Sequence, residues 1–472
     1  MNVFYYPDLV VVRVATLIKA QPQQVSLLLC FGLSFLAGLA FRCLLLSASG
    51  RTLPGAARTR HALSMGLGLA LGFFCYRWDF FINVVSALIA YILIRFVVPQ
   101  KVHYVVFGSA MGILSIVHAQ RVVTHALDNG QYKMDVSGSL MVLTQRLTAL
   151  ACSIHDGMGR KRDDLTRDQE EQCVREIPSV LEFFSYAFNF PTILIGPLCF
   201  YRDYICFIEG KHYLVEDKNG HVRRTSGVKP ALKKFLFSLM WLGLYVKFVG
   251  TYSIQLNGDP DVLNRPWLQR SWIAYASMLT QRFRFYFAWT IADSIANAAG
   301  LGFNGFDENS NEKWNLITNT DILGTEFALN FKHLLESWNI QTSVWLKRVC
   351  YERVKFRPFL LTNILVAWWH GFFPIYYVGW VGFGFSVLAA RHIRRVIRPY
   401  FQKHYVLQRF YDCLTIVTTM AFLTYYVVTI ALMDFGKTFS FWRSQYFLGH
   451  LIPIAVVLLC SRKKQVKKDK DD

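Results

Sequence analysis

The sequence predicts an all-α integral membrane protein, because it is rich in apolar residues and because these residues cluster. Of its 472 residues, 53% are hydrophobic and 16% aromatic, with a mean hydropathy of +0.28, which is too apolar for a chain of soluble domains. The stretches 25–46, 80–98 and 102–117 carry few charges, and each is near the ~20 residues that a helix needs to cross a bilayer. The same composition excludes a disordered chain, a collagen and a small disulfide-stapled protein.

The chain is also strongly basic, with 51 Lys and Arg against 31 Asp and Glu and a formal net charge of +20. The basic residues lie in the connections between apolar stretches, at 160–175, 211–234, 347–357, 391–409 and 462–470. This pattern is typical of the cytosolic loops of membrane proteins, which attract anionic lipids and phosphorylated ligands. We therefore expect a membrane partner and no nucleic acid.

The N-terminal half predicts an interfacial segment followed by helices. Within residues 1–24, the Val-rich stretch 8–19 is too short to span and suits an amphipathic helix in the interface. Spanning or buried helices are expected at about 25–46, 62–76, 80–98, 102–118 and 137–154. The last of them carries Gln145 and Arg146 in its middle, and a charge at that depth faces protein or water rather than lipid.

A broken segment is expected at 179–200, where Pro191 and Gly196-Pro197 interrupt an apolar stretch. Irregular backbone at membrane depth is tolerated only where it is buried in protein or lines a cavity. We therefore expect a kinked or re-entrant segment here, and we assign Asn189 to the wall of a cavity.

The C-terminal half predicts further helices on either side of a polar region. They are expected at about 232–250, 270–302, 359–390, 411–434 and 443–460. The second of them contains the polar groups Gln281, Arg282, Arg284 and Asp293. That is too many for a lipid-facing helix.

The remaining segments complete a single polytopic membrane domain over residues 1–472. Residues 304–357 are the least membrane-like part of the second half, and 461–472 form a basic tail. We see no internal repeat of the kind that builds transporters from two halves. The economical interpretation is one domain of about ten or eleven helices.

The most informative single residue is His370, in the apolar run VAWWHGFFP at 366–374. An imidazole in such a run costs more than an apolar side chain, and ionisable groups at membrane depth are usually functional. With an ordinary pKa of about 6.5, histidine can accept a proton at neutral pH. The alternative interpretation is a histidine hydrogen-bonded to a neighbouring helix.

A second candidate is Asn339, in the stretch SWNIQTSVWLKR at 337–348. In a helix, Trp338 and Trp345 would share one face and Asn339 would lie on the adjacent face. An amide can donate to a developing oxyanion or hold a hydroxyl, although it cannot act as a base. The alternative role for Asn339 is capping or packing.

The cations that follow, Lys347, Arg348 and Arg353, suit phosphate groups. As a bare charge cluster they also suit a solvated cytosolic face. Both interpretations stay open at this point.

Two other patterns are weaker. His212 and Asp217 match the H-x4-D spacing of soluble glycerolipid acyltransferases, but two fixed positions arise easily by chance. His118, His125 and His155 form no recognisable ligand motif, so we expect no metal site.

Together these residues resemble the signature of the membrane-bound O-acyltransferases (MBOAT), most closely their lysophospholipid acyltransferase branch. Asn339 follows a Trp in a polar stretch, and His370 follows after 30 intervening residues in an apolar W-H-G-x-x-P context. The resemblance runs from about residue 130 to 450 and includes WNIQT (338–342), WLKRVCYER (345–353), WHG (369–371) with Pro374 and YY (376–377), GPL (196–198) before YRDY (201–204), HDG (155–157) and GFNG (302–305). This branch usually has Gly where Ile375 stands, so we expect a narrowed or reshaped cavity beside His370.

The resemblance implies a multi-span helical fold around an intramembrane reaction chamber. It implies an acyltransferase that moves a fatty acyl group from acyl-CoA to a lysophospholipid hydroxyl in phospholipid remodelling, with His370 as general base and Asn339 as its polar partner. No metal and no cofactor other than acyl-CoA as co-substrate is expected. The predicted substrate-binding residues are Lys347, Arg348 and Arg353 for the CoA phosphates, with Trp338, Trp345, Trp369 and Asn189.

The resemblance leaves the acceptor and the assembly open. Lysophosphatidylethanolamine, lysophosphatidylserine and lysophosphatidylcholine are the favoured acceptors, and a homodimer is an option. The alternatives are an MBOAT enzyme with a sterol, diacylglycerol or protein acceptor, and a membrane transporter whose buried His and Arg form a polar pathway. An endoplasmic-reticulum membrane is expected, because the chain ends in KKDKDD, where Lys468 and Lys470 resemble a dilysine retrieval signal on a cytosolic tail.

Overall fold

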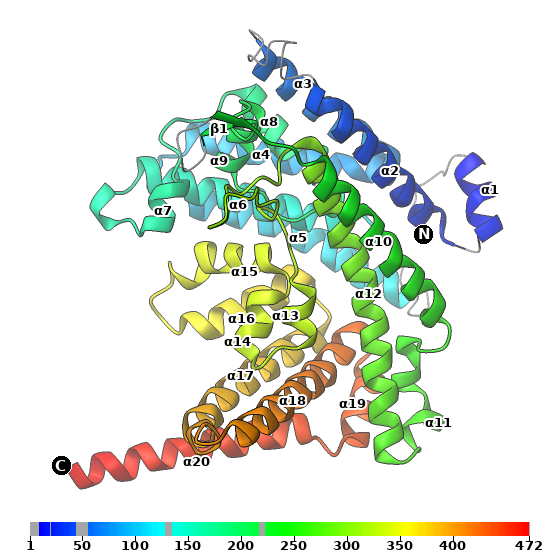
Figure 1. The fold of residues 1–472 in the computed structure, drawn as a ribbon, viewed down its shortest axis with the longest axis vertical. Coiled ribbons are helices and arrows are strands. Elements are labelled where there is room, and N and C mark those ends of the chain that lie inside the picture. Colours follow the sequence, from blue (N-terminus) through cyan, green and yellow to red (C-terminus); the bar gives the residue numbers. More distant parts are fainter. Residues whose placement is uncertain (1–8, 19, 44–54, 128–134, 217–221, 472) are drawn as a thin grey trace. The chain divides into compact units, whose positions relative to one another are not determined.

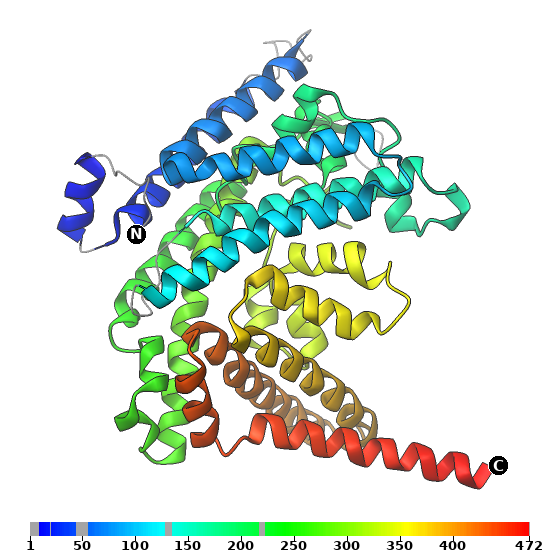
Figure 2. The same cartoon turned by 180° about the vertical axis from the view of Figure 1, so that it is seen from behind.

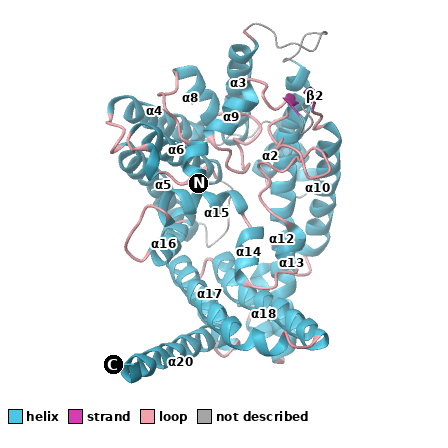
Figure 3. Cartoon of the chain, turned by 60° about the vertical axis from the view of Figure 1, so that its left-hand side comes forward, coloured by secondary structure: helices cyan, strands magenta, loops and turns pink. Residues whose placement is uncertain are grey.

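The protein is almost entirely helical. Its computed structural model describes residues 9–18, 20–43, 55–127, 135–216 and 222–471, and Figures 1 and 3 show how helices dominate this part of the chain. The strands within it are one short antiparallel pair, β1 (Leu214–Glu216) and β2 (Val222–Arg224). The predicted all-α class is therefore confirmed.

In the described part of the chain, four helical stretches are long and apolar enough to cross a membrane, by length and composition. They are Pro22–Cys43, Ala56–Phe96, Val102–Leu127 and Tyr405–Leu432. The other helices that were expected to span are shorter or less apolar, and two of the expected segments, 137–154 and 270–302, bury the charged side chains of Arg146 and Arg282 in the protein.

Contacts divide the chain into two compact units. Unit 1 comprises Met1–Leu239, Phe287–Asn319 and Val344–Arg353, and unit 2 comprises Met240–Tyr286, Thr320–Ser343 and Val354–Asp472. Such units are defined by contacts and not by independent folding. The expected single domain therefore stays a prediction.

Unit 1 contains the N-terminal helices in the order that the sequence predicts. They are α1 (Leu9–Ile18), α2 (Pro22–Cys43), α3 (Ala56–Tyr76), the 3-10 turn η1 (Arg77–Phe80), α4 (Phe81–Phe96), α5 (Val102–Leu127), α6 (Ser137–Met158), η2 (Arg162–Asp164), α7 (Arg167–Gln172), α8 (Val180–Ala187), α9 (Tyr201–Ile208) and the start of α10 (Val228–Val249). Helix α5 packs along α6, and α4 packs against both; Figure 2 shows α4 and α5 in light blue and cyan. Val11 and Ala15 of α1 are buried with Val25 of α2.

The broken segment after α8 is held by a buried arginine. The Arg146 side chain of α6 is not exposed, and it donates to the Ala187 carbonyl at 2.7 Å and to the Thr192 hydroxyl. Gly196 packs so closely that a Cβ there would lie 2.5 Å from Thr192 Cα. Both expectations are confirmed: 188–200 is irregular, buried chain, and the charge of Arg146 faces protein.

Unit 2 contains the end of α10 and the C-terminal helices. They are η3 (Ile254–Gly258), α11 (Pro260–Leu263), the first part of α12 (Trp267–Ala299), α13 (Ile322–Glu326), α14 (Phe331–Ser337), the start of α15 (Ile340–Leu346), α16 (Pro358–His370), α17 (Pro374–Phe401), α18 (Tyr405–Leu432), α19 (Phe435–Ser444) and α20 (Leu448–Asp471). The gold-to-red helices α17, α18 and α20 lie together in Figures 1 and 2, and α17 also packs on α16. Helix α15 continues into the π-helix η4 (Lys347–Tyr351), which belongs to unit 1.

Two expected helices are each split in two. The predicted helix 359–390 ends at His370 and restarts at Pro374, and the predicted helix 443–460 is divided between α19 and α20. Tyr446 and Phe447, with φ of 53° and 52°, make the second break in the left-handed region. Neither residue type signals such a turn, so sequence periodicity alone misses it.

Candidate active site

His370 lies at a helix end that glycine creates. It is the last residue of α16, and Gly371 follows with φ 137° and ψ −172°, a conformation that is essentially restricted to glycine. Pro374 then opens α17, where its missing N–H costs nothing. The W-H-G-x-x-P motif is therefore a helix break that places an imidazole at a helix terminus inside an apolar segment.

Aromatic rings surround this imidazole. Trp380 of α17 stacks on it with ring centroids 5.3 Å apart and planes 16° from parallel. Trp369 meets it edge-on at 4.7 Å, and Tyr376 lies at 6.4 Å. Contacts of this kind fix the plane of the imidazole, which is only partly buried.

Asn339 occupies a strained position at the start of α15. Its φ is +50°, in the left-handed region where a side chain is uncommon and where Asn is better tolerated than most residues. Its carbonyl accepts the N–H of Ser343 at 3.0 Å and so begins the helix. Strain of this kind is concentrated at functional sites and persists only where the surrounding structure enforces it.

A buried ion pair provides part of that enforcement. Arg282 of α12 is 4% exposed and donates from Nε and Nη2 to the two oxygens of Glu326, at 2.7 and 2.9 Å. The Tyr286 hydroxyl, one turn further along α12, donates to Glu326 Oε1 at 2.6 Å. These three contacts attach the end of α13 to α12. They confirm that α12 directs the charge of Arg282 into the protein, whereas Arg284, which was expected to do the same, is exposed.

The same turn of α12 holds the residue before Asn339. Trp338 packs edge-on against Phe285 at 5.7 Å and against Tyr286 at 6.0 Å. The strand-like bridge between Trp338 and Thr320 closes the segment that contains α13 and α14 into a loop. Asn339 is therefore the first residue after a loop that is closed by the Thr320–Trp338 bridge and that packs on α12 through Trp338.

Helix α17 braces the segments that carry both candidate residues. Its Trp380 contacts His370, and its Phe383 meets Trp380 at 6.3 Å and Phe331 of α14 at 5.3 Å. Helix α14 ends two residues before Asn339. His370 and Asn339 thus belong to one compact unit and share α17 as a support.

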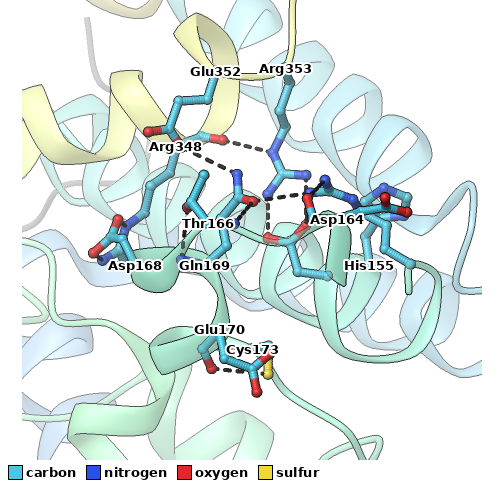
Figure 4. A network of polar contacts seen from close by, with 12 residues as sticks. His155, Asp164, Thr166, Asp168, Gln169, Glu170, Cys173, Arg348, Glu352 and Arg353 are labelled. Carbon is cyan, nitrogen blue, oxygen red and sulfur yellow. Dashed lines mark hydrogen bonds and ion pairs between the residues drawn. The ribbon is translucent and has the colours of Figure 1, made fainter. Parts of the chain in front are cut away.

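The predicted phosphate-binding cations lie in unit 1, and each pairs with a carboxylate. Figure 4 shows two of them, Arg348 beside Asp168 and Arg353 near Arg348. Arg348 donates from Nε and Nη2 to Asp168, at 2.9 and 2.6 Å, and its guanidinium lies 4.0 Å from the ring centre of Phe200. Its third nitrogen, Nη1, is buried without a partner among the described residues. Arg348 and Arg353 line a recess between α6, α7 and the π-helix.

Arg353 is the most fully engaged of the three. Its Nε donates to the Arg348 carbonyl at 2.7 Å, and Nη1 and Nη2 donate to the carboxylate of Asp156 at 3.0 and 2.6 Å. Burial by itself lowers the pKa of Arg353, but the neighbouring Cys152 thiol and the Asp156 carboxylate outweigh it, so this pKa is raised. Lys347 is 55% exposed and pairs with Glu352 at 3.3 Å.

Comparison with known proteins places the chain. The profile of the MBOAT, membrane-bound O-acyltransferase family, matches residues 125–428. The chain belongs to this family.

The relatives match most of this chain. It is 39% identical over 453 residues to membrane-bound glycerophospholipid O-acyltransferase 2 of Rattus norvegicus, covering 94% of this chain and 86% of that protein. It is 35% identical over 451 residues to membrane-bound glycerophospholipid O-acyltransferase 1 of Homo sapiens, covering 94% and 90%. Lysophospholipid acyltransferase 6 of Drosophila melanogaster is 37% identical over 413 residues, covering 85% of this chain and 57% of that protein.

Membership confirms the resemblance drawn from the sequence motifs. The chain is an acyltransferase and a multi-pass membrane protein. The transporter interpretation is therefore set aside, and the buried His and Arg residues belong to an enzyme.

Two residues predicted to bind substrate have structural contacts in unit 1 of this MBOAT enzyme. Trp345 is fully buried, and its indole nitrogen donates to the Thr148 hydroxyl of α6 at 2.9 Å. Asn189 is also fully buried, and its amide donates to the Tyr186 carbonyl and accepts from Thr192. Trp338 and Trp369 instead lie beside the two candidate catalytic residues.

The weaker patterns gain no support. Asp217 lies outside the described residues, and burial lowers the pKa of His212 to about 4, which makes it a weak base at neutral pH. Among the described residues, no three His, Cys, Asp or Glu side chains converge on a possible metal position.

Sequence reasoning missed several residues that shape the site. Nothing in the spacing connects Glu326 with Arg282 or Asp168 with Arg348, because these partners are far apart in the chain. A buried arginine needs a carboxylate partner. The sequence therefore indicates that such partners exist, but it does not identify them. No sequence pattern points to Trp380, since a single Trp in an apolar helix is usually a core residue.

Proposed function

We propose that this acyltransferase transfers a fatty acyl group from acyl-CoA to the free hydroxyl of a lysophospholipid. The observation that carries the proposal is the likeness, over 94% of the chain, to relatives named glycerophospholipid O-acyltransferases. The relative named lysophospholipid acyltransferase 6 points to the same acceptor class. Lysophosphatidylethanolamine, lysophosphatidylserine and lysophosphatidylcholine are the expected acceptors, re-acylated at sn-2.

His370 acts as the general base in this proposal. It removes the proton of the acceptor hydroxyl as that oxygen attacks the thioester carbon. The tetrahedral intermediate then collapses, the carbon–sulfur bond breaks, and the leaving CoA sulfur takes the proton back from the imidazolium. A thioester is already activated, so the step needs a base, orientation and stabilisation of one oxyanion.

Asn339 supplies the polar contact in the same step. Its amide N–H₂ can donate to the thioester oxygen as negative charge develops there, or it can hold the acceptor hydroxyl. The strained φ of +50° fits a side chain whose direction matters more than its helix propensity. The scheme uses no acyl-enzyme, no metal and no cofactor beyond acyl-CoA. One chain supplies both residues, so the scheme does not need the homodimer, which stays a prediction.

The first prediction concerns these two residues. Purified protein with labelled acyl-CoA should acylate lysophospholipids and not a sterol, a diacylglycerol or a peptide. His370→Ala should lower kcat by at least about 10² to 10⁴, the usual contribution of a positioned base, and Asn339→Ala by about 10² to 10³ through loss of one preorganised donor. His404→Ala, at an exposed histidine of unit 2, serves as the control and should keep wild-type activity.

Folding is checked by size-exclusion profile and thermal stability in detergent. Activity of folded His370→Ala above about a tenth of wild type would contradict the assignment of the base. Acylation of a sterol, diacylglycerol or peptide in place of lysophospholipids would contradict the acceptor.

The second prediction divides the three cations. Lys347 is exposed and Arg348 has a spare Nη1, so we propose that these two contact CoA phosphates. Lys347→Ala and Arg348→Ala should each raise KM for acyl-CoA roughly tenfold, the value of one charge-assisted hydrogen bond, with KM for lysophospholipid unchanged. Lys355→Ala, at an exposed cation of the same run, is the control.

Arg353 should behave differently, because its guanidinium is already occupied by Asp156 and a carbonyl. Arg353→Ala should lower the free energy of unfolding by about 1–3 kcal/mol, since Arg160 is then the one ion-pair partner that Asp156 keeps among the described residues. Equal effects on both substrates by all three changes would show that the run has only a structural role.

The third prediction concerns location. We propose residence in the endoplasmic reticulum with the C-terminus in the cytosol, supported by the basic tail with Lys468 and Lys470 near its end. Appending a few residues after Asp472 should mask a terminal signal and let part of the protein reach later compartments. Unchanged reticulum staining would assign retention to the helices, and protease protection of a C-terminal tag in sealed microsomes would reverse the topology.

A further inference from the structure

The indole of Trp380 in α17 places a polar N–H group inside the protein. Its Nε1 atom is buried and has no hydrogen-bond partner among the described residues. A buried N–H without a partner destabilises a fold, whereas a phenylalanine at the same position would bury no polar atom. Trp241 and Trp442 also have such a nitrogen, so what sets Trp380 apart is the group on which its ring is stacked.

Indole differs from phenyl in the stronger negative potential above the face of its ring. The Trp380 ring is stacked 16° from parallel on His370, so the imidazole faces the negative potential above the π system. Tryptophan has the strongest attraction for a cation among the aromatic residues, and the attraction grows when water is excluded. It acts on His370 only while the imidazole carries the proton that it has taken from the acceptor.

The Trp442–His450 pair shows that the stacked arrangement is not a general property of Trp–His contacts in this chain. Trp442 also has a buried Nε1 without a partner among the described residues, and it lies 4.6 Å from His450. Its ring, however, meets that imidazole at 78°, and His450 Nδ1 is bonded to the Tyr425 hydroxyl at 2.7 Å. Trp442 thus offers a matched control with the same residue types and a different geometry.

We propose that Trp380 is a positioning residue which holds the His370 imidazole face-on and stabilises its protonated form in the transition state of acyl transfer. The inference rests on the proposed role of His370 as base. Because the interaction strengthens only as the proton moves, Trp380 contributes to kcat and not to the binding of either substrate. The same reasoning explains why an unsatisfied N–H is retained beside the reaction centre.

The test replaces Trp380 by tryptophans with one, two and four ring fluorines, introduced by site-specific incorporation into the full-length protein. Fluorine withdraws charge from the ring face and leaves its shape nearly unchanged, so each added fluorine should lower kcat stepwise, to roughly 3- to 30-fold below wild type for the tetrafluoro ring. KM for acyl-CoA and for lysophospholipid should stay within twofold. Trp380→Phe should fall within the series, and Trp380→Leu below it.

The control is the same fluorine series at Trp442, which should leave kcat unchanged. If kcat is flat across the series at Trp380 while wild-type protein acylates lysophospholipid, this inference is overturned and the proposed function stands. If wild-type protein forms no acylated product from any lysophospholipid, the proposed function itself fails. A parallel rise of both KM values at constant kcat would reassign Trp380 to substrate binding and would also overturn the inference.

Discussion

The geometry of unit 2 depends on the charge of Arg282, which α12 carries into the protein interior. A guanidinium that is 4% exposed cannot remain there without a counter-charge, because the cost of removing it from water is several kcal/mol. Glu326 provides that charge through two hydrogen bonds, and Tyr286 adds a third contact to the same carboxylate. The need to pair one buried cation thus fixes where α13 ends.

The attachment of α13 to α12 also affects the candidate catalytic residue Asn339. The segment 320–338 is closed on itself at Thr320 and Trp338, and Trp338 rests on the same turn of α12 as the ion pair. Asn339 follows in a left-handed conformation that an isolated chain would seldom adopt. A bidentate pair is a rigid attachment with a defined geometry, which suits the precise placement that the role proposed for Asn339 needs.

Much of this architecture could be predicted from residue patterns, and the failures have physical reasons. Periodicity and hydropathy located the helices, and charges at membrane depth identified Arg146 and Arg282 as inward-facing. The predicted helix 359–390 runs through the W-H-G-x-x-P segment without a break, and this was wrong because Gly371 takes a φ of 137° that tertiary packing selects. Ion-pair partners were out of reach, since Glu326 and Asp168 are joined to their arginines only by the fold.

The predicted phosphate-binding run also changes when its contacts are known. From the sequence, Lys347, Arg348 and Arg353 are three equivalent cations. In the structure Arg353 is held by Asp156 and a carbonyl, Arg348 is held by Asp168 with one nitrogen to spare, and Lys347 is largely exposed. Charge counting cannot separate a cation that holds a loop in place from one that can bind a ligand, because the difference lies in which donors are already used.

With Asn339 in its proposed role, we expect the Arg282–Glu326 pair to act on acyl transfer through the position of that side chain. A double-mutant cycle on kcat tests it most directly, with Arg282→Lys, Asn339→Ala and the combined variant assayed beside wild type. Arg282→Lys keeps the charge and loses the bidentate geometry, so alone it should lower kcat by roughly tenfold or more, as a small misplacement of a catalytic group does. In the Asn339→Ala background the same change should cost almost nothing, because the group that it positions is already gone. An equal loss of kcat in both backgrounds would contradict the claim and would separate the ion pair from the chemistry of Asn339.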